Sequence, residues 1–200
     1  MYKVNELFYS LQGEGYWTGA PMVFVRFCGC NLQCPFCDTD HREGSWMEAD
    51  EIAAEVRRAF AEGGSAGPFR VCLTGGEPLL QVDAALVGAL KEAGFLLHLE
   101  TNGTQAVPEG IDWVTCSPKE DVRNLKGNGA VVLEKADELK LVLSPGIDPQ
   151  RWAHFPAPWH FLQPCSQADG SANLEETITY VKAHPLWRLS LQTHKYLKIR

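Results

Sequence analysis

Three cysteines on one short segment, Cys30, Cys34 and Cys37, are the residues best suited to hold a metal group. They stand in a C-x3-C-x2-C pattern within the run from Cys28 to Asp38. Three thiolates can bind three irons of a cubane cluster, because thiolate is the usual cluster ligand, and the fourth iron then has no protein ligand. An open iron can chelate a substrate or a cofactor. The spacing therefore predicts a [4Fe-4S] cluster that takes part in chemistry.

The same thiols could also belong to a zinc site or to a redox pair. A zinc site would take four thiolate or mixed ligands, and no distant Cys-x2-Cys or Cys-x2-His pair supplies the remainder. A thioredoxin-type redox pair would use Cys34 and Cys37 but would leave Cys30 without a role. Cys28 could instead begin a C-x5-C-x2-C triad, and we assign it to the end of the preceding strand. The cluster accounts for all three cysteines of the first pattern.

A second motif, Thr74 to Pro78 with the sequence TGGEP, follows the apolar run 69–73. Its two glycines let the backbone approach a ligand closely, and the Glu77 carboxylate can accept hydrogen bonds from an ammonium group. The same residues also suit an ordinary turn that leads into a helix. With Phe36 directly before the last cysteine, the two motifs together resemble those of the radical S-adenosylmethionine (SAM) superfamily, in which the glycine motif binds the SAM amino group.

These motifs need elements that position them, and the chain alternates between strand and helix periodicities. Seven β-rich runs are predicted as strands: 22–27, 69–73, 95–99, 113–116, 139–143, 160–162 and 187–191. Amphipathic patterns predict helices at 49–62 and 82–93. A third helix is predicted from Leu174 to Ala183, with Asn173 as its N-cap and Glu176 completing a variant capping box.

Strands that alternate with helices predict a parallel sheet with right-handed crossovers. An eight-unit barrel needs about 250 residues. The chain has 200 residues, which indicates an α/β fold whose roughly six βα units form an incomplete TIM-like barrel, as a single domain over 1–200. Active-site residues in such folds lie at the C-terminal ends of strands, so each motif is expected to follow a strand. The runs 63–68 and 121–137 are predicted loops.

The composition is that of a globular protein, with 45% hydrophobic and 22% charged residues. A formal net charge of −7 argues against a polyanion partner, so no nucleic acid is expected. The longest apolar stretches are strand-sized and the first residues lack a signal-peptide pattern, which predicts a cytoplasmic protein without membrane association. Seven cysteines is an odd count, and Cys72, Cys116 and Cys165 are scattered. A disulfide framework is therefore not expected.

Further segments narrow the resemblance. They are LQGEG at 11–15, CDT at 37–39, ETNG at 100–103, SPK at 117–119 and QTHKYL at 192–197. Each alone could be a plain loop or turn. In this order along the whole chain, they resemble the 7-carboxy-7-deazaguanine synthase family. The resemblance implies a carbon–nitrogen lyase that converts 6-carboxy-5,6,7,8-tetrahydropterin to 7-carboxy-7-deazaguanine with loss of ammonia, on the route to queuosine and related 7-deazapurines.

The resemblance also implies roles for particular residues. The positions that match the family's pterin contacts are Leu11, Gln12, Gly13, Glu14, Arg26, Thr74 and His194. The positions that match its SAM contacts are Phe36, Cys37, Asp38, Gly76, Glu77, Glu100, Ser117, Pro118, Lys119 and Gln163. Cys30, Cys34 and Cys37 would bind the cluster, and the Thr39 hydroxyl would bind Mg2+, which prefers oxygen ligands and retains water. No catalytic side chain is implied beyond the cluster and SAM.

Partners follow from the same resemblance, and two rival interpretations stay open. Members of the family are commonly homodimers, and reduction of the cluster calls for a donor such as a flavodoxin.

A small radical SAM activase, which installs a glycyl radical on a protein, would share the cluster and SAM motifs. It would not need segment 11–15, Arg26 or segment 194–197. A non-enzymatic zinc or iron–sulfur module would be distinguished by its content of iron, acid-labile sulfide and zinc.

Overall fold

The computed structural model describes residues 1–166 and 171–200, and within them one sheet contains nine strands. The strands are β1 Tyr2–Leu11, β2 Pro21–Phe27, β3 Ser45–Met47, β4 Arg70–Gly75, β5 Leu96–Thr101, β6 Trp113–Cys116, β7 Glu138–Leu143, β8 Trp159–Pro164 and β9 Trp187–Leu189. The helices are α1 Ala49–Glu62, α2 Ala84–Glu92, α3 Pro149–Trp152, α4 Leu174–Ala183 and α5 Thr193–Leu197, with a short 3-10 helix, η1, at Pro78–Leu80.

The sheet confirms the predicted parallel architecture. Its order is β3-β1-β2-β4-β5-β6-β7-β8-β9, and the seven strands from β2 onward, β3 excepted, pair in parallel. The edges at β3 and β9 leave the sheet open, as an incomplete barrel requires. All seven predicted strands are present. They were recognisable because strands buried on both faces form short apolar runs.

Strands β1 and β3 were not predicted. β1 pairs antiparallel with β2 and shifts register between Val4 and Glu6. Such a bulge breaks the alternation that marks a half-buried strand. β3 has only three residues, too few to show a period. Neither strand could therefore be read from the pattern.

The three predicted helices are present, and one capping detail is wrong. Asn173 occupies the N-cap of α4, but its side chain makes no capping hydrogen bond. Its Oδ1 accepts from the backbone N of Cys165 at 2.8 Å, and its Nδ2 donates to the carbonyl of Leu143 at 2.8 Å and to Glu176 at 3.0 Å. Asn173 therefore ties the end of β8 to the end of β7, and tertiary contacts displace the local capping box.

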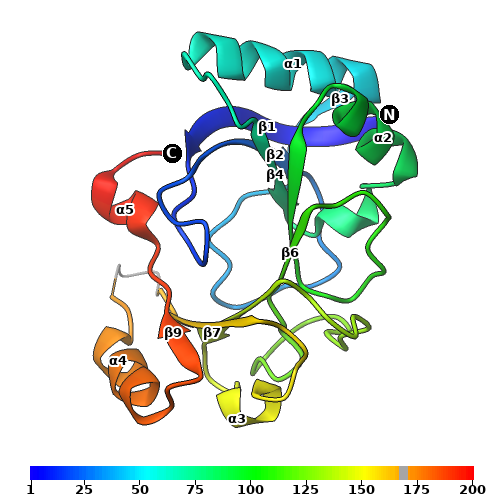
Figure 1. Ribbon diagram of the computed structural model, residues 1–200. Coiled ribbons are helices and arrows are strands. Elements are labelled where there is room, and N and C mark those ends of the chain that lie inside the picture. Colours follow the sequence, from blue (N-terminus) through cyan, green and yellow to red (C-terminus); the bar gives the residue numbers. More distant parts are fainter. Residues whose placement is uncertain (167–170) are drawn as a thin grey trace.

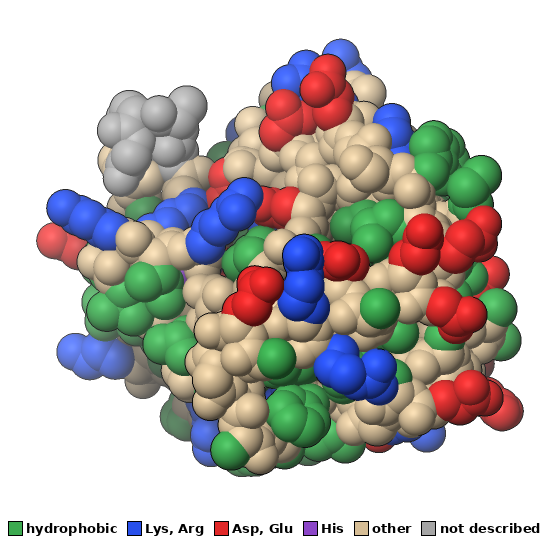
Figure 2. Space-filling view, turned by 90° about the horizontal axis from the view of Figure 1, so that it is seen from above, with side chains coloured by type: hydrophobic (Ala, Val, Ile, Leu, Met, Phe, Trp, Pro, Cys, Tyr) green, Lys and Arg blue, Asp and Glu red, His purple; other side chains and the backbone are tan. Residues whose placement is uncertain are grey.

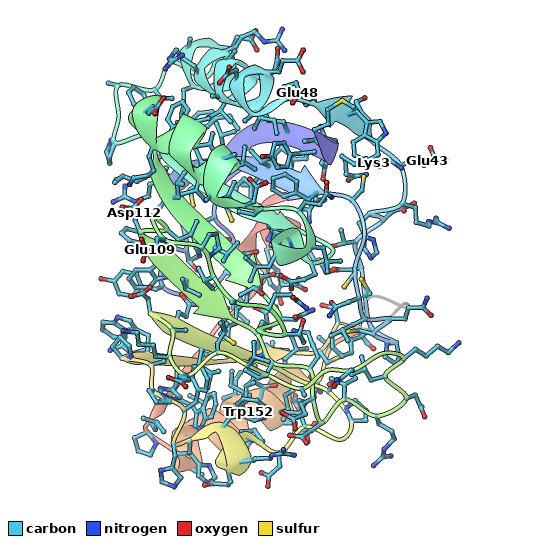
Figure 3. All side chains as sticks on the ribbon, turned by 90° about the vertical axis from the view of Figure 1, so that its right-hand side faces the viewer. Lys3, Glu43, Glu48, Glu109, Asp112 and Trp152 are labelled. Carbon is cyan, nitrogen blue, oxygen red and sulfur yellow. The ribbon has the colours of Figure 1, made fainter. Side chains whose placement is uncertain are left out.

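Two hydrophobic clusters fill the space between sheet and helices. The larger packs α1 and α2 against β2, β4 and β5, and the smaller packs around β7, β8 and α3. Figure 1 shows α1 and α2 outside one half of the sheet and α3 and α4 outside the other. In Figure 3, Glu48 at the start of α1 and Trp152 of α3 mark these opposite ends. The helices thus occupy the outside. The inner face carries a small third cluster of Met22, Phe24 and Cys72 together with polar groups.

The surface carries both signs of charge. In the face shown in Figure 2, acidic and basic side chains are interspersed with hydrophobic ones. None of the helices within residues 1–166 and 171–200 has the length and apolar character needed to cross a bilayer. The predicted loops are also present, because residues 63–68 and 121–137 contain no helix or strand.

The loop between β1 and β2 enters the barrel from the end opposite to the other motifs. Leu11 pairs with Pro21, the first residue of β2, because β1 runs antiparallel. The ring of Tyr16 then stacks on Trp113 and Trp159, with centroids 4.8 and 4.9 Å apart. These tryptophans begin β6 and β8. Segment 11–15 therefore follows a strand as expected, but because β1 is antiparallel it reaches the interior from the N-terminal ends of the parallel strands.

Candidate active site

A cavity of about 890 Å³ opens at the C-terminal ends of the parallel strands. It brings together most of the residues predicted from the sequence, although they are spread over the whole chain. Those that line it are Leu11, Gln12, Gly13, Glu14, Arg26, Cys30, Cys34, Phe36, Cys37, Asp38, Thr39, Thr74, Gly76, Glu100, Ser117, Lys119, Gln163 and His194. Glu77 and Pro118 are buried behind its wall.

The cysteine segment forms one side of this cavity. Cys30, Cys34 and Cys37 all face it, and the Cys30 sulfur accepts from the backbone N of Leu32 at 3.4 Å. Burial raises the pKa of the Cys30 and Cys34 thiols. Cys28 is buried and its thiol donates to the carbonyl of Glu43 at 3.1 Å. The fold therefore separates Cys28 from the three cysteines of the pattern.

The three thiols suit a cluster better than a single ion. Within the described residues, no three His, Cys, Asp or Glu side chains converge on one metal position. A cubane takes one thiolate at each of several irons, so its ligands need not meet at one point. The glycine motif packs directly against the start of the cysteine segment: a Cβ on Gly76 would lie 2.1 Å from the carbonyl oxygen of Gly29.

Glu77 fixes the loop that carries Gly29 relative to the end of β5. Its backbone N donates to Gly29 at 2.9 Å. Its fully buried carboxylate accepts from the Thr101 hydroxyl at 2.8 Å and from the backbone N of Asn102 at 2.7 Å. Burial raises the pKa of Glu77 despite these donors. The side chain thus connects the glycine motif to the end of β5 and does not line the cavity.

A buried polar network forms the inner wall of the cavity. Glu100 of β5 accepts from Gln12 Nε2 at 3.0 Å on one oxygen and from the Thr74 hydroxyl at 3.0 Å on the other. The Nζ of Lys140 lies 3.9 Å from the first oxygen and donates to the Glu14 carboxylate. The side chain of Lys140 is 7% exposed. Residues from four strands or their loops are thereby fixed relative to one another.

Charge compensation keeps this network ionised. Burial alone would raise the pKa of Glu100, but the nearby Lys140 ammonium lowers that pKa together with His98 and the hydrogen bonds from Thr74 and Gln12. Burial alone would lower the pKa of Lys140, but Glu14, Glu100 and Glu138 together raise it. The buried cation therefore favours the charged, accepting form of Glu100 and pairs with Glu14.

Among the other cations that line the cavity, Arg26 and Lys119 are held by neighbouring polar groups. Arg26 donates through Nε to Glu6 at 2.7 Å, and Arg200 also pairs with Glu6 at 2.6 Å. Lys119 donates to the carbonyl and the hydroxyl of Ser117 at 2.6 and 2.7 Å. Burial lowers the pKa of Lys119. Both cations lie where a ligand carboxylate could be bound.

The segment 192–195 closes one side of the cavity. The backbone N of Thr193 donates to the carbonyl of Gly13 at 2.9 Å, and a Cβ on Gly13 would lie 2.0 Å from Nδ1 of His194. Lys195 donates to Asp38 at 2.6 Å and Gln192 donates to Glu14 at 2.8 Å. Burial lowers the pKa of His194, which favours its neutral form. Position 13 must therefore be glycine, because a side chain there would clash with His194. The segment also connects Asp38, predicted on the SAM side, with Glu14, predicted on the pterin side.

Sequence reasoning missed Lys140 and Gln192. Lys140 stands in the strand sequence ELKLVL, where Leu139 and Leu141 pack outward into the smaller hydrophobic cluster. A lysine at the alternate position of a buried strand points to the opposite face, and a buried lysine needs a partner. That signal was available in the sequence. Gln192 offered none, because its partners Glu14 and Asp38 are remote in the chain.

Comparison with known proteins identifies the family. Residues 24–134 match the radical SAM superfamily. The 7-carboxy-7-deazaguanine synthase of Bacteroides thetaiotaomicron is 50% identical over 200 residues, covering all of both chains. The chain belongs to this family. It is therefore an enzyme of the radical SAM type, whose members use a [4Fe-4S] cluster, SAM and a reductant, and it acts on a small molecule.

Two other proteins agree with the assignment. The 7-carboxy-7-deazaguanine synthase of Bordetella pertussis is 42% identical, with 99% of each chain covered. Among solved structures, QueE from Escherichia coli superimposes with a TM-score of 0.72 at 28% identity, covering 95% of this chain and 93% of that one. The family match thus includes the partial barrel as well as the sequence.

Proposed function

We propose that this enzyme converts 6-carboxy-5,6,7,8-tetrahydropterin to 7-carboxy-7-deazaguanine with loss of ammonia, in a SAM- and Mg2+-dependent step toward queuosine and related 7-deazapurines. The observation that carries the proposal is the meeting of three sets of residues in one cavity: the three cysteines, the SAM-side groups around Glu100 and Lys119, and the substrate-side groups of segment 11–15 with Arg26. Relatives of that name over the full chain support the same reaction.

The cofactor side has groups that fit a cluster and SAM. Cys30, Cys34 and Cys37 would bind three irons, and their metallation would release thiol protons because burial holds Cys30 and Cys34 protonated. Glu100 presents an ionised carboxylate to ribose hydroxyls, and Lys119 presents an ammonium to the SAM carboxylate. When both are bound, the cluster and SAM supply hydrogen-atom abstraction. The protein supplies placement and exclusion of water.

The substrate side has groups that fit a planar heterocycle with one carboxylate. Glu14 can accept hydrogen bonds from an N–H edge of the pterin. The Arg26 Nε is engaged by Glu6, which fixes the guanidinium plane so that its terminal nitrogens can pair with the substrate carboxylate. Gln12 and Thr74 are held by Glu100. Neutral His194 completes this side as a hydrogen-bonding group.

Mg2+ would bind at Thr39 together with the substrate carboxylate. The Thr39 hydroxyl lies 3.5 Å from Asp38 Oδ1, so the protein offers oxygen donors at this edge of the cavity. Mg2+ prefers such donors and keeps several waters. A site with so few protein ligands depends on the substrate for its remaining affinity.

Three broader features belong to the same proposal. The enzyme would work in the cytoplasm as a homodimer. A small acidic redox protein such as a flavodoxin would reduce the cluster. These features rest on the family resemblance.

The test is an anaerobic assay with reconstituted protein, SAM, reductant, Mg2+ and 6-carboxytetrahydropterin, followed by mass spectrometry for 7-carboxy-7-deazaguanine. Product that appears only with SAM present supports both the reaction and the substrate. Cleavage of SAM to 5'-deoxyadenosine without the deazaguanine would refute the substrate and would favour a different radical SAM activity, such as that of an activase.

A further inference from the structure

One buried lysine connects the two sides of the cavity. Lys140 lies on the inner face of β7 and contacts both Glu14, a substrate-side residue, and Glu100, a cofactor-side residue. The same Glu100 accepts from Gln12 and Thr74, which line the substrate side. Lys140 is thus the cation at the centre of a network that spans both sites.

We propose that Lys140 is a positioning residue that couples SAM binding to pterin binding by holding the Glu14 and Glu100 carboxylates in place on the two sides of the cavity. The inference deepens the proposed function and rests on it for the identity of the two ligands. Lys140 would transfer no proton and no electron. Its contribution would be the orientation and charge of two groups that touch the ligands.

The energetic reason lies in the burial of the pair. A buried ion pair is costly to break, because removal of one partner leaves an uncompensated charge. Here the loss of Lys140 would leave two carboxylates without their shared cation, and burial would then raise the pKa of Glu100. A protonated Glu100 is a poorer acceptor for ribose hydroxyls. Lys140 therefore determines the pH range in which SAM can bind.

Other ionisable groups face this network. His98 precedes Glu100 on β5, and burial lowers its pKa to about 4, so it adds no positive charge near neutral pH. Those that interact electrostatically with Glu100 or Lys140 are Glu14, Cys72, His98, Lys119, Glu138 and His194, and Arg26 interacts with Cys72. Arg26 pairs with Glu6, and Lys119 bonds to Ser117. Lys140 is the cation in contact with both Glu14 and Glu100.

The experiment measures SAM affinity of the reconstituted holoenzyme between pH 6 and pH 9, by anaerobic equilibrium dialysis without pterin. The variants are Lys140→Met and Lys140→Arg, and the control is Lys91→Met. Lys91 pairs with Asp112 at 2.7 Å on the outside of α2 and is remote from the cavity. Iron content is measured for every sample, so that loss of the cluster is not mistaken for loss of SAM binding.

Wild type and Lys91→Met should bind SAM with nearly constant affinity across this range. Lys140→Met should lose affinity as the pH falls, by up to about tenfold per pH unit below the raised pKa of Glu100, since one proton then competes with SAM. Lys140→Arg should bind SAM with an affinity that changes little with pH, as in wild type. A Lys140→Met profile parallel to that of wild type, whatever its absolute affinity, would overturn the proposal.

A second arm covers the case in which Lys140→Met does not fold. The double variant Glu14→Gln with Lys140→Met removes both members of the closest pair and leaves only Glu100 unpaired. Its SAM affinity should show the same loss at low pH, whereas Glu14→Gln alone should keep the flat profile. A flat profile in the double variant would contradict the proposed role.

A third arm separates this inference from the proposed function. With 6-carboxytetrahydropterin as substrate at pH 8, Lys140→Met should raise KM by roughly tenfold, as expected for one strong charge-assisted hydrogen bond, and lower kcat less. If wild type makes no deazaguanine, the proposed function fails while the SAM profile still tests Lys140. If wild type is active and the SAM profile of Lys140→Met is unchanged, only the inference fails.

Discussion

The cysteine segment and the polar wall of the same cavity are built in different ways. In the segment, Cys37 and Asp38 are exposed, and burial keeps the Cys30 and Cys34 thiols protonated. In the wall, Gln12 and Glu100 are already hydrogen-bonded and Lys140 is charge-paired. The fold therefore forms the wall in advance, whereas the proposed cluster would bind to the segment with release of thiol protons.

The largest expected effect follows from removal of one metal ligand. Replacing Cys30, Cys34 or Cys37 by Ala should abolish both cluster assembly and turnover, because a cubane held by two thiolates has too few protein ligands. Iron and sulfide analysis, with the absorbance of the reconstituted protein, measures assembly. The thermal stability of the metal-free protein should change little, since these side chains are not part of either hydrophobic cluster.

Cys28→Ala is the matched control. Cys28 is buried against Glu43 and Gly44 and does not line the cavity that the other three cysteines face. The variant should therefore keep its iron and most of its activity. Loss of the cluster in Cys28→Ala, with retention in Cys30→Ala, would show that the ligands are Cys28, Cys34 and Cys37.

The next effect concerns the preformed wall. Gly13→Ala should lower kcat/KM by roughly 100-fold, because a displacement of about 1 Å in a site can cost that much. A Cβ at this position would lie 2.0 Å from His194 Nδ1 and would push segment 192–195 outward. Iron content should stay at the wild-type level. Steady-state kinetics and iron analysis test both statements.

Gly88→Ala in α2 is the control, because a Cβ there meets no atom within 4 Å. It should leave kinetics unchanged. Equal activity of Gly13→Ala and Gly88→Ala would mean that segment 192–195 moves freely, and the wall would then be less preformed than the contacts indicate.

The same contrast explains what could be predicted from the sequence. The cysteine pattern and the TGGEP motif are local, so their spacing was informative before any fold was known. The polar wall joins residues far apart, as Lys140 and Glu14 are separated by 126 positions and Gln192 and Glu14 by 178. Family resemblance supplied Glu14 and Glu100 but not the lysine between them. Only the pairing of β7 within the sheet brings that lysine to the cavity.

The parallel strands were predictable for a related reason. Most of them are buried on both faces, so they appear as short apolar runs whatever their neighbours are. The edge strand β9 is an exception, because Arg188 is exposed. The local capping box at Asn173 failed because its side chain bonds to Cys165 and Leu143, which no local rule includes. Prediction therefore succeeded where a short segment determines its own structure and failed where remote segments do.

A smaller effect is expected at the edge of the cysteine segment. Thr39→Ala should raise the Mg2+ concentration needed for half-maximal activity by roughly tenfold, the lower end of the losses seen when groups around a metal are removed. Cluster content should not change, because the hydroxyl is not a cluster ligand. Thr39→Ser keeps the hydroxyl and should behave as wild type. Iron loss in Thr39→Ala would mean that the two metal sites are not independent.

The smallest effect on activity is expected at Glu138, beneath the wall. Its carboxylate accepts from the backbone N of Tyr16 at 3.1 Å, and burial raises its pKa from 4.5 to about 7. The folded state therefore binds more protons than the unfolded state between these two values, and stability falls as the pH rises through them. The penalty is at most roughly 3 kcal/mol, at about 1.4 kcal/mol per pKa unit.

Glu138→Gln removes this titration while keeping a similar shape. The difference in Tm between variant and wild type should become more favourable to the variant from pH 5 to pH 8, by several degrees at roughly 2–4 °C per kcal/mol. Glu109→Gln on an exposed loop (Figure 3) should show no such trend. A constant Tm difference across this range would mean that Glu138 stays ionised beside Lys140. In that case Lys140 would be paired with three carboxylates rather than two, and the charge of the wall would be more negative than its hydrogen bonds indicate.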